Sequence, residues 1–239
     1  MKDNVSAFCA EEYDEKIKKT LPYYEEFYRQ VIDVVKAKFD RPVKWLDVGC
    51  GTGKMAEEAW KAVKIDRLLC CDHSPEMVRT SRERFQSKNV EFLTASLLDM
   101  DIEETFDVVT AIQVLHYFKG EERMKAVRKC FEALNAGGIF LTFENFAPYS
   151  EAGKKLFLKR WKAYQMQQGR SKEECEKHLQ RYGKEYYPVT ISEQMDSLKQ
   201  CGFKDCEIIW VSNMQAGLLG IKGRDYNENT FHRTGKSSV

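Results

Sequence analysis

The sequence predicts an α/β fold built around a mostly parallel sheet, and two observations support this. Short runs rich in β-branched and aromatic residues alternate with longer helical stretches, the pattern of successive β-α-β units. The 239 residues, 43% of them hydrophobic and 31% charged, suffice for one large domain with a sizeable core. We expect that domain over residues 1–222, with a polar tail at 223–239.

An amphipathic helix is expected first, before the sheet. Apolar residues recur at helical spacing from Tyr24 to Val35, and the pattern stops before Arg41-Pro42. The alternation follows. The expected strands are VKWLDV (43–48), RLLCCD (67–72), VEFLT (90–94), FDVVTAI (106–112) and GGIFLTFE (137–144), and the expected helices cover 54–63, 75–87 and 121–134.

A charged, aromatic-rich stretch then interrupts the alternation, and residues 146–190 are expected to form a helical cap. Ser192 is the expected N-cap of a helix that ends at Cys201-Gly202. The strands DCEIIWV (205–211) and MQAGLLGIK (214–222) complete the sheet. Within the cap, the aromatic residues either wall a substrate or, more simply, pack the cap on the sheet; they are Trp161, Tyr164 and Tyr187. His178 and, in the tail, His232 are expected to face solvent.

Composition and charge exclude several classes of protein. The 38 basic and 37 acidic residues give a net charge of +1, so no overall attraction to nucleic acid or membranes is expected. The basic run at 154–162 fits an RNA contact less well than a solvated helix face. The start of the chain has no apolar segment typical of a signal or membrane anchor, which predicts a cytoplasmic protein. The 8 scattered cysteines predict reduced thiols and no metal site.

The most informative segment is the glycine loop Gly49-Cys50-Gly51-Thr52-Gly53, which joins a predicted strand to a predicted helix. Glycines permit positive φ and close approach of a ligand, although such loops also serve as plain corners. Asp72 ends the next strand, where a carboxylate can accept both ribose hydroxyls, or else cap the helix that begins at Ser74-Pro75. Together these features predict an adenosine cofactor.

Two adenosine cofactors compete, a nicotinamide dinucleotide and S-adenosylmethionine. The spacing G-x-G-x-G followed by Lys54 departs from the dinucleotide pattern G-x-G-x-x-G. Asp47 would be poorly placed beside a pyrophosphate, but it is well placed to orient the loop around an ammonium group. S-adenosylmethionine carries an ammonium group, so it is favoured, with S-adenosylhomocysteine as product.

These motifs resemble those of the class I S-adenosylmethionine-dependent methyltransferases over Trp45–Lys222. The matching segments are LDVGCGTG, CCDHSPEMV, FDVVTAIQVLHYF and LNAGGIFLTFE. The resemblance implies a doubly wound, seven-stranded sheet of order 3-2-1-4-5-7-6 with the last strand antiparallel. It also implies a set of cofactor contacts: Gly49, Cys50 and Gly51 at the methionine moiety, Asp72 at the ribose, His73 and Met77 in the adenosine pocket, Ser96 and Leu97 at the adenine edge, and Ile112 and Gln113 at the methionine end. Ser96 stands where the family usually has an acid.

A closer resemblance is to the branch of carboxy-S-adenosylmethionine synthases of the tRNA wobble-uridine pathway and related small methyltransferases. The chain shares with them Pro22-x-Tyr24 and the long cap. In that branch the matching tyrosine folds over the cofactor, so residues 1–40 are expected to form a helical lid with Tyr24 in it. The synthase holds an extra carboxylate with an arginine whose position, counted back from Gly202-Phe203, is Ser197 here, which argues against bidentate carboxylate binding.

Methyl transfer depends mainly on positioning the acceptor, and a general base is optional. His116 is the candidate catalytic residue, either facing the methyl group as a base or packed under the cap. Glu144 and Asn145 are candidate substrate contacts or helix caps. Three functions stay open: methyl transfer to a small molecule, a synthase-like or tRNA-modifying activity, and cofactor binding without catalysis. The oligomeric state, including a homodimer, also stays open.

Overall fold

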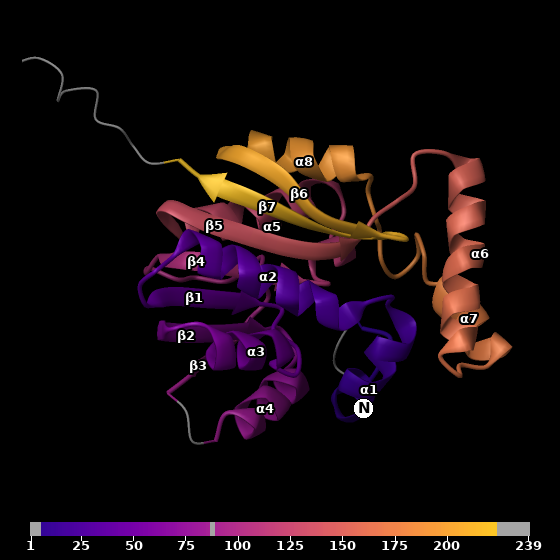
Figure 1. The fold of residues 1–239 in the computed structure, drawn as a ribbon, viewed down its shortest axis with the longest axis horizontal. Coiled ribbons are helices and arrows are strands. Elements are labelled where there is room, and N and C mark those ends of the chain that lie inside the picture. Colours follow the sequence, from indigo (N-terminus) through magenta and orange to yellow (C-terminus); the bar gives the residue numbers. More distant parts are fainter. Residues whose placement is uncertain (1–5, 87–88, 224–239) are drawn as a thin grey trace, which may run out of the picture.

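The computed structural model describes residues 6–86 and 89–223, and its centre is a single seven-stranded sheet (Figure 1). The strands are β1 (Val43–Val48), β2 (Ile65–Asp72), β3 (Glu91–Thr94), β4 (Phe106–Ile112), β5 (Leu134–Asn145), β6 (Phe203–Ser212) and β7 (Gln215–Lys222). Their order is β3-β2-β1-β4-β5-β7-β6. Strands β1 to β5 pair in parallel, whereas β7 is antiparallel to both of its neighbours. The predicted strand order and the antiparallel last strand are confirmed.

Helices cover both faces of the sheet, and the predicted helices are confirmed with ends shifted by a few residues. Those between the strands are α3 (Lys54–Ala62), α4 (Pro75–Arg84), α5 (Gly120–Glu132) and α8 (Ile191–Gln200). On one face α2 (Tyr24–Lys38) and α3 pack against the sheet, and α5 and α8 cover the other (Figure 1). Neighbouring residues of β1 therefore enter different cores, Trp45 the first and Leu46 the second. Burial on both faces explains why the strands are continuous apolar runs.

The N-terminal region contains one helix more than the sequence predicted. Helix α1 (Ala10–Thr20) precedes α2, and the turn between them includes Tyr23, whose φ of 56° lies in the left-handed region. Only Ala10, Ile17 and Thr20 of α1 are buried. A helix with so narrow an apolar face leaves a weak periodic signal in the sequence, which is why it was missed.

The cap predicted at 146–190 contains α6 (Glu151–Gln167) and α7 (Lys172–Leu179), and it packs against α1 beyond the same end of the sheet (Figure 1). Trp161 is fully buried, and its Nε1 donates to the carbonyl oxygen of Thr20 at 2.6 Å. The hydroxyl of Tyr164 donates to the carbonyl oxygen of Lys18 at 3.2 Å. Packing therefore accounts for the burial of Trp161, which contacts Thr20 of α1 and His178 of α7.

Two expectations about this region are wrong. His178 does not face solvent: it is buried, and its ring meets the edge of Trp161 with ring centroids 5.3 Å apart. The N-cap of α8 is Thr190, not Ser192, because Glu193 lies three residues after Thr190 and closes a capping box with it. The helix ends at Cys201-Gly202 as predicted. His232 and all of the predicted tail except Gly223 lie outside the described residues.

None of the helices within residues 6–86 and 89–223 combines the length and apolar character needed to span a bilayer. All eight cysteines are free thiols, and six of them are buried.

Candidate functional site

The glycine loop follows β1 directly and is tied to the neighbouring strand by a carboxylate. Gly49, Gly51 and Gly53 have φ of 62°, 54° and 80°, values that favour glycine. The Oδ2 atom of Asp72 accepts a hydrogen bond from the backbone nitrogen of Gly51 at 2.8 Å, and its Oδ1 accepts from the nitrogen of Ser74 at 2.9 Å. Asp72 thus joins the loop to the residue that precedes α4. The N-cap of α4 is Ser74, whose hydroxyl accepts from the backbone nitrogen of Met77, so Asp72 is not the N-cap, and its contact with a ribose stays a prediction.

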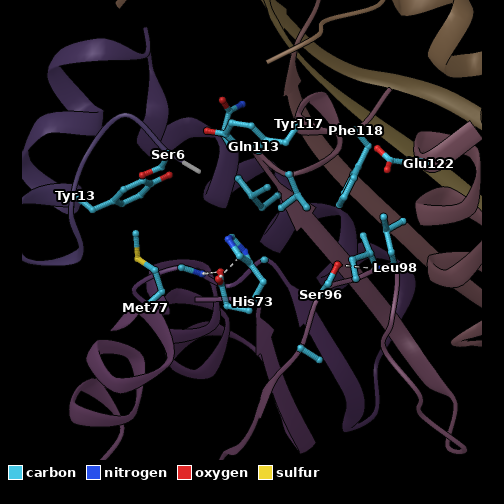
Figure 2. Close-up of a pocket in the computed structure, with 17 residues that line it drawn as sticks. Ser6, Tyr13, His73, Met77, Ser96, Leu98, Gln113, Tyr117, Phe118 and Glu122 are labelled. Carbon is cyan, nitrogen blue, oxygen red and sulfur yellow. Dashed lines mark hydrogen bonds and ion pairs between the residues drawn. The ribbon is translucent and has the colours of Figure 1, made fainter. Parts of the chain in front are cut away.

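A main cavity of about 350 Å³ opens at the carboxyl ends of the parallel strands. It is lined by most of the predicted cofactor contacts: Gly49, Gly51, Asp72, His73, Met77, Ser96, Leu97, Ile112 and Gln113. Figure 2 shows Tyr13 and Met77 on one side of this cavity and Ser96, Leu98 and Phe118 on the other. Tyr13 could not be predicted from the sequence, because it lies on α1, the helix with a weak periodic signal.

The glycine loop leaves room for a bound group on the side of the main cavity. A Cβ atom built on Gly51 would meet no heavy atom within 4 Å, whereas one built on Gly49 would collide with the side chain of Val114. Gly49 is therefore required by packing, and Gly51 borders open space. A carboxylate at Asp72 and an open backbone at Gly51 fit the ribose and methionine parts of S-adenosylmethionine.

A smaller cavity of about 20 Å³ adjoins the loop and contains the predicted contacts that do not reach the main cavity: Tyr24, Asp47 and Cys50. Oδ1 of Asp47 accepts from the Thr110 hydroxyl at 2.7 Å, and Oδ2 has no hydrogen-bond partner among the described residues. Burial raises the pKa of Asp47 to about 7. Tyr24 is buried and lines this cavity together with the half-buried Tyr13, and its role over a cofactor stays a prediction.

His116 lies in a third space, the inner cavity, which holds about 20 Å³. The inner and main cavities share the wall residues Ser6, Tyr13, Gln113 and Tyr117. The imidazole is buried, and its Nδ1 is hydrogen-bonded to Oε2 of Glu144. The ring is therefore packed beneath the cap, bonded to a carboxylate, and it lines the inner cavity, while its role as a base stays a prediction.

Glu144 and Asn145 organise the wall between the cavities. Oε1 of Glu144 accepts from the backbone nitrogens of Val114 and Leu115 at 3.0 and 2.8 Å, so it caps the short 3₁₀ helix η1 (Leu115–Tyr117) and not the helix that follows it in sequence. Asn145 donates to Oε1 of Gln113 at 2.8 Å. It also lines the inner cavity, so a substrate contact remains open to it.

The inner cavity contains a guanidinium that the sequence analysis did not consider. Ser197 is half-buried on α8, and its hydroxyl donates to the carbonyl oxygen of Glu193 at 2.8 Å. Arg181, near the end of the cap, is buried and lines the inner cavity, and its Nε donates to Glu185 at 2.6 Å. The chain therefore places an arginine beside the main cavity, although the position that corresponds to the synthase arginine is Ser197.

Comparisons with known proteins find methyltransferases and related enzymes. Residues 46–138 match a family model described as a methyltransferase domain. The carboxy-S-adenosyl-L-methionine synthase of Nautilia profundicola is 25% identical over 88% of this chain and 90% of its own length, and that of Staphylococcus epidermidis is 21% identical over 89% and 93%. Among solved structures, the plantazolicin methyltransferase BpumL has a TM-score of 0.69 at 14% identity, covering 90% of each chain. The YcgJ protein of Bacillus subtilis has a TM-score of 0.63 at 16% identity, covering 84% of this chain and 99% of its own.

Residues 46–138 thus match a methyltransferase domain, and the chain has the strand order and the glycine loop of the class I S-adenosylmethionine-dependent methyltransferases, which it resembles. Within that class it is similar to the branch of the carboxy-S-adenosyl-L-methionine synthases.

Proposed function

We propose that the chain binds S-adenosylmethionine in the main cavity, transfers its methyl group to a small-molecule acceptor and releases S-adenosylhomocysteine. The observation that carries this proposal is the open space at Gly51 beside the carboxylate of Asp72. Bound there, the cofactor supplies a methyl group already activated by a sulfonium. Asp72 would hold the ribose, Ser96 and Leu97 would border the adenine, and the free oxygen of Asp47 would face the ammonium group from behind the loop.

The contribution of the protein is then mainly positioning and exclusion of water. Helix α1 and the cap close the same end of the sheet, and two hydrogen bonds to Thr20 hold them together. Trp161 donates to the carbonyl oxygen of Thr20 at 2.6 Å, and Arg170 donates to its hydroxyl at 2.9 Å. The inner cavity lies beneath them and meets the main cavity at Gln113 and Tyr117. We assign the acceptor to this junction.

Calorimetric titration with S-adenosylmethionine and S-adenosylhomocysteine tests the first half of the proposal, and mass-spectrometric detection of S-adenosylhomocysteine across a panel of acceptors tests the second. We expect both ligands to bind and at least one acceptor to be methylated. Binding without any turnover would favour a non-catalytic cofactor-binding protein. Failure of both ligands to bind would contradict the proposal.

A second candidate is a carboxy-S-adenosylmethionine synthase-like activity, and Arg181 is the observation that favours it. The side chain of Arg181 is hydrogen-bonded to the Tyr117 hydroxyl, and both residues line the inner cavity. A guanidinium is the group best suited to hold a carboxylate in a fixed orientation. This guanidinium would bind one oxygen of a carboxyl group carried on the cofactor or on an acceptor.

The synthase-like candidate predicts a carboxylated cofactor in the purified protein, which mass spectrometry of the co-purifying ligand would detect. Arg181→Met should weaken binding of carboxy-S-adenosylmethionine about tenfold or more and leave S-adenosylmethionine affinity unchanged. Arg160→Met is the matched control, because Arg160 is an exposed arginine on the cap helix α6. Equal affinity of the wild-type protein for both cofactors would contradict this second candidate.

A further inference from the structure

We infer that Glu144 is a positioning residue that holds His116 as a general base at the inner cavity, so that the acceptor is a molecule whose nucleophile carries a proton, a hydroxyl or an amine. The inference rests on the proposed methyl transfer and deepens it by naming the substrate class. Both side chains are almost fully buried, with exposed fractions of 3% for His116 and 2% for Glu144.

The hydrogen bonds around Glu144 show which form its carboxyl group takes. Oε1 accepts from the backbone nitrogens of Val114 and Leu115 and from the hydroxyl of Thr142 at 3.0 Å, while Oε2 accepts from the backbone nitrogen of His116 at 3.3 Å. With both oxygens accepting, Glu144 has the arrangement of an ionised carboxylate. The protein tolerates the nearly complete burial of this charge because these hydrogen-bond donors compensate the loss of hydration.

This carboxylate fixes the tautomer of His116. An ionised carboxylate can only accept, so the hydrogen between Oε2 of Glu144 and Nδ1 of His116 belongs to the imidazole. In the neutral ring the lone pair is then on Nε2, the nitrogen that can take up a proton. A turn-capping role alone would need only the contacts with the backbone, and the bond to Nδ1 goes beyond it.

The surroundings of His116 place its ring at the inner cavity, next to the junction to which the acceptor is assigned. The imidazole packs between two tyrosines, with ring centroids 4.4 Å from Tyr117 and 5.6 Å from Tyr186, and all three line the inner cavity. A volume of about 20 Å³ admits one group the size of a water molecule. The reacting end of an acceptor therefore fits beneath the cap, and the shared wall at Gln113 and Tyr117 connects it to the main cavity.

The chemistry explains why a base indicates a protic acceptor. As the acceptor oxygen or nitrogen forms its bond to the methyl carbon, the bond between that carbon and sulfur breaks with its electron pair on sulfur, and the acceptor proton passes to Nε2 of His116. Glu144 stabilises the resulting imidazolium by the charge on its carboxylate. An acceptor without a removable proton, such as a thioether or a tertiary amine, would give this pair of residues no task.

Histidine-selective ¹⁵N NMR of the full chain bound to S-adenosylhomocysteine tests the positioning role directly. We expect the ring of His116, assigned by its loss in His116→Gln, to carry its hydrogen on Nδ1. In Glu144→Gln the amide must donate to Nδ1, so the hydrogen should move to Nε2, while the amide oxygen still accepts from the turn. Glu193→Gln, which alters a glutamate that caps α8, is the matched control and should leave the spectrum of His116 unchanged.

A wild-type ring with its hydrogen on Nε2 would overturn the positioning role without any variant, and so would an unchanged tautomer in a folded Glu144→Gln protein. A second measurement compares wild-type methylation of aromatic and aliphatic alcohols and amines with that of their thioether and tertiary-amine analogues. Methylation of the analogues alone, or at equal rates, would overturn the substrate class. Failure of S-adenosylhomocysteine to bind the wild type would instead refute the proposed function, so the two failures are distinguishable.

Discussion

Asp72 connects the cofactor cavity to the architecture around it. Its two oxygens accept from the backbone of Gly51 and Ser74, and the side chain also borders the main cavity. Asp72→Ala should therefore weaken S-adenosylmethionine binding by about 1–3 kcal/mol, the cost of losing charge-assisted hydrogen bonds. Calorimetry measures the affinity. Asp66→Ala, which removes an exposed acid from the other end of β2, should leave it unchanged. Equal affinity in a folded Asp72→Ala protein would remove Asp72 from the site.

Valine substitutions at Gly51 and Gly183 separate the loss of cofactor space from backbone strain. A side chain there is strained by the positive φ and would project into the space assigned to the cofactor. Gly51→Val should abolish detectable S-adenosylmethionine binding while the protein stays folded. Gly183→Val is the matched control, because Gly183 also has a positive φ with open space around its missing Cβ, but lies in the cap. Circular dichroism and calorimetry on both variants decide the outcome, and normal affinity in Gly51→Val would mean that the loop is only a corner.

At the scale of single residues, the sequence predicted positions that a local motif specifies. Gly51 and Asp72 belong to one strand-loop-helix-strand unit, so their meeting follows from local spacing. The burial of His178 and Arg181 depends instead on how the cap folds back over the sheet, and no local pattern contains that information. The hydrogen bond between His116 and Glu144 joins η1 to β5, and the sequence indicated each residue without indicating their contact.

At the scale of elements, hydrogen bonds and an ion pair connect helix α1 to the glycine loop. Asp14 accepts from the hydroxyl of Thr52 at 2.5 Å and pairs with Arg84, whose Nε also donates to the carbonyl oxygen of Thr52 at 2.8 Å. These contacts join α1, the loop and α4. The helix that closes the site is therefore anchored to the loop that borders the cofactor.

Asp14→Ala should remove the contacts with Thr52 and Arg84 and raise the dissociation rate of S-adenosylhomocysteine several-fold, because a lid with fewer contacts opens more often. The core should keep its stability, since Asp14 lies outside it. Stopped-flow displacement measures the rate, and hydrogen exchange over residues 10–20 should accelerate in parallel. Glu15→Ala, on the same helix, removes an acid that pairs with the exposed Lys19 and should have no such effect. An unchanged dissociation rate in Asp14→Ala would mean that α1 is a fixed part of the fold.

At the scale of the whole molecule, the order of strands could be predicted because burial on both faces and β-α-β alternation leave a clear signal, and because the motifs resembled those of a known class. Strand β5 shows both effects, as an apolar run paired on both edges. The arrangement of α1 against the cap could not be predicted. It depends on contacts such as Trp161 with Thr20, which are 141 residues apart in the chain.

Two buried groups make the stability of the whole chain depend on pH in opposite directions. Burial, together with the charges of Arg170 and Arg181, lowers the pKa of His178 to about 3, below the ordinary value near 6.5. Between these values the unfolded chain binds more protons at this site than the folded one, so stability falls as pH falls. Asp47 has the opposite sign. Its pKa is raised to about 7, so between about pH 4 and 7 the folded chain binds more protons and stability falls as pH rises.

Substitution at each site should therefore stabilise the protein at opposite ends of the range. His178→Leu should raise the free energy of unfolding more at about pH 4.5 than at about pH 7.5, because it removes a ring that must stay uncharged. Asp47→Asn should do the reverse, since at about pH 7.5 it removes a buried carboxylate whose Oδ2 has no partner among the described residues. Urea unfolding of the wild type and both variants at both pH values gives the change in unfolding free energy that each substitution causes. For each variant, this change should differ by at least about 1 kcal/mol between the two pH values. Asp66→Asn controls for the change in net charge at an exposed site. A difference for His178→Leu that is the same at both pH values would show that the cap is open enough to hydrate this ring, and the same result for Asp47→Asn would show that water reaches the carboxylate behind the glycine loop.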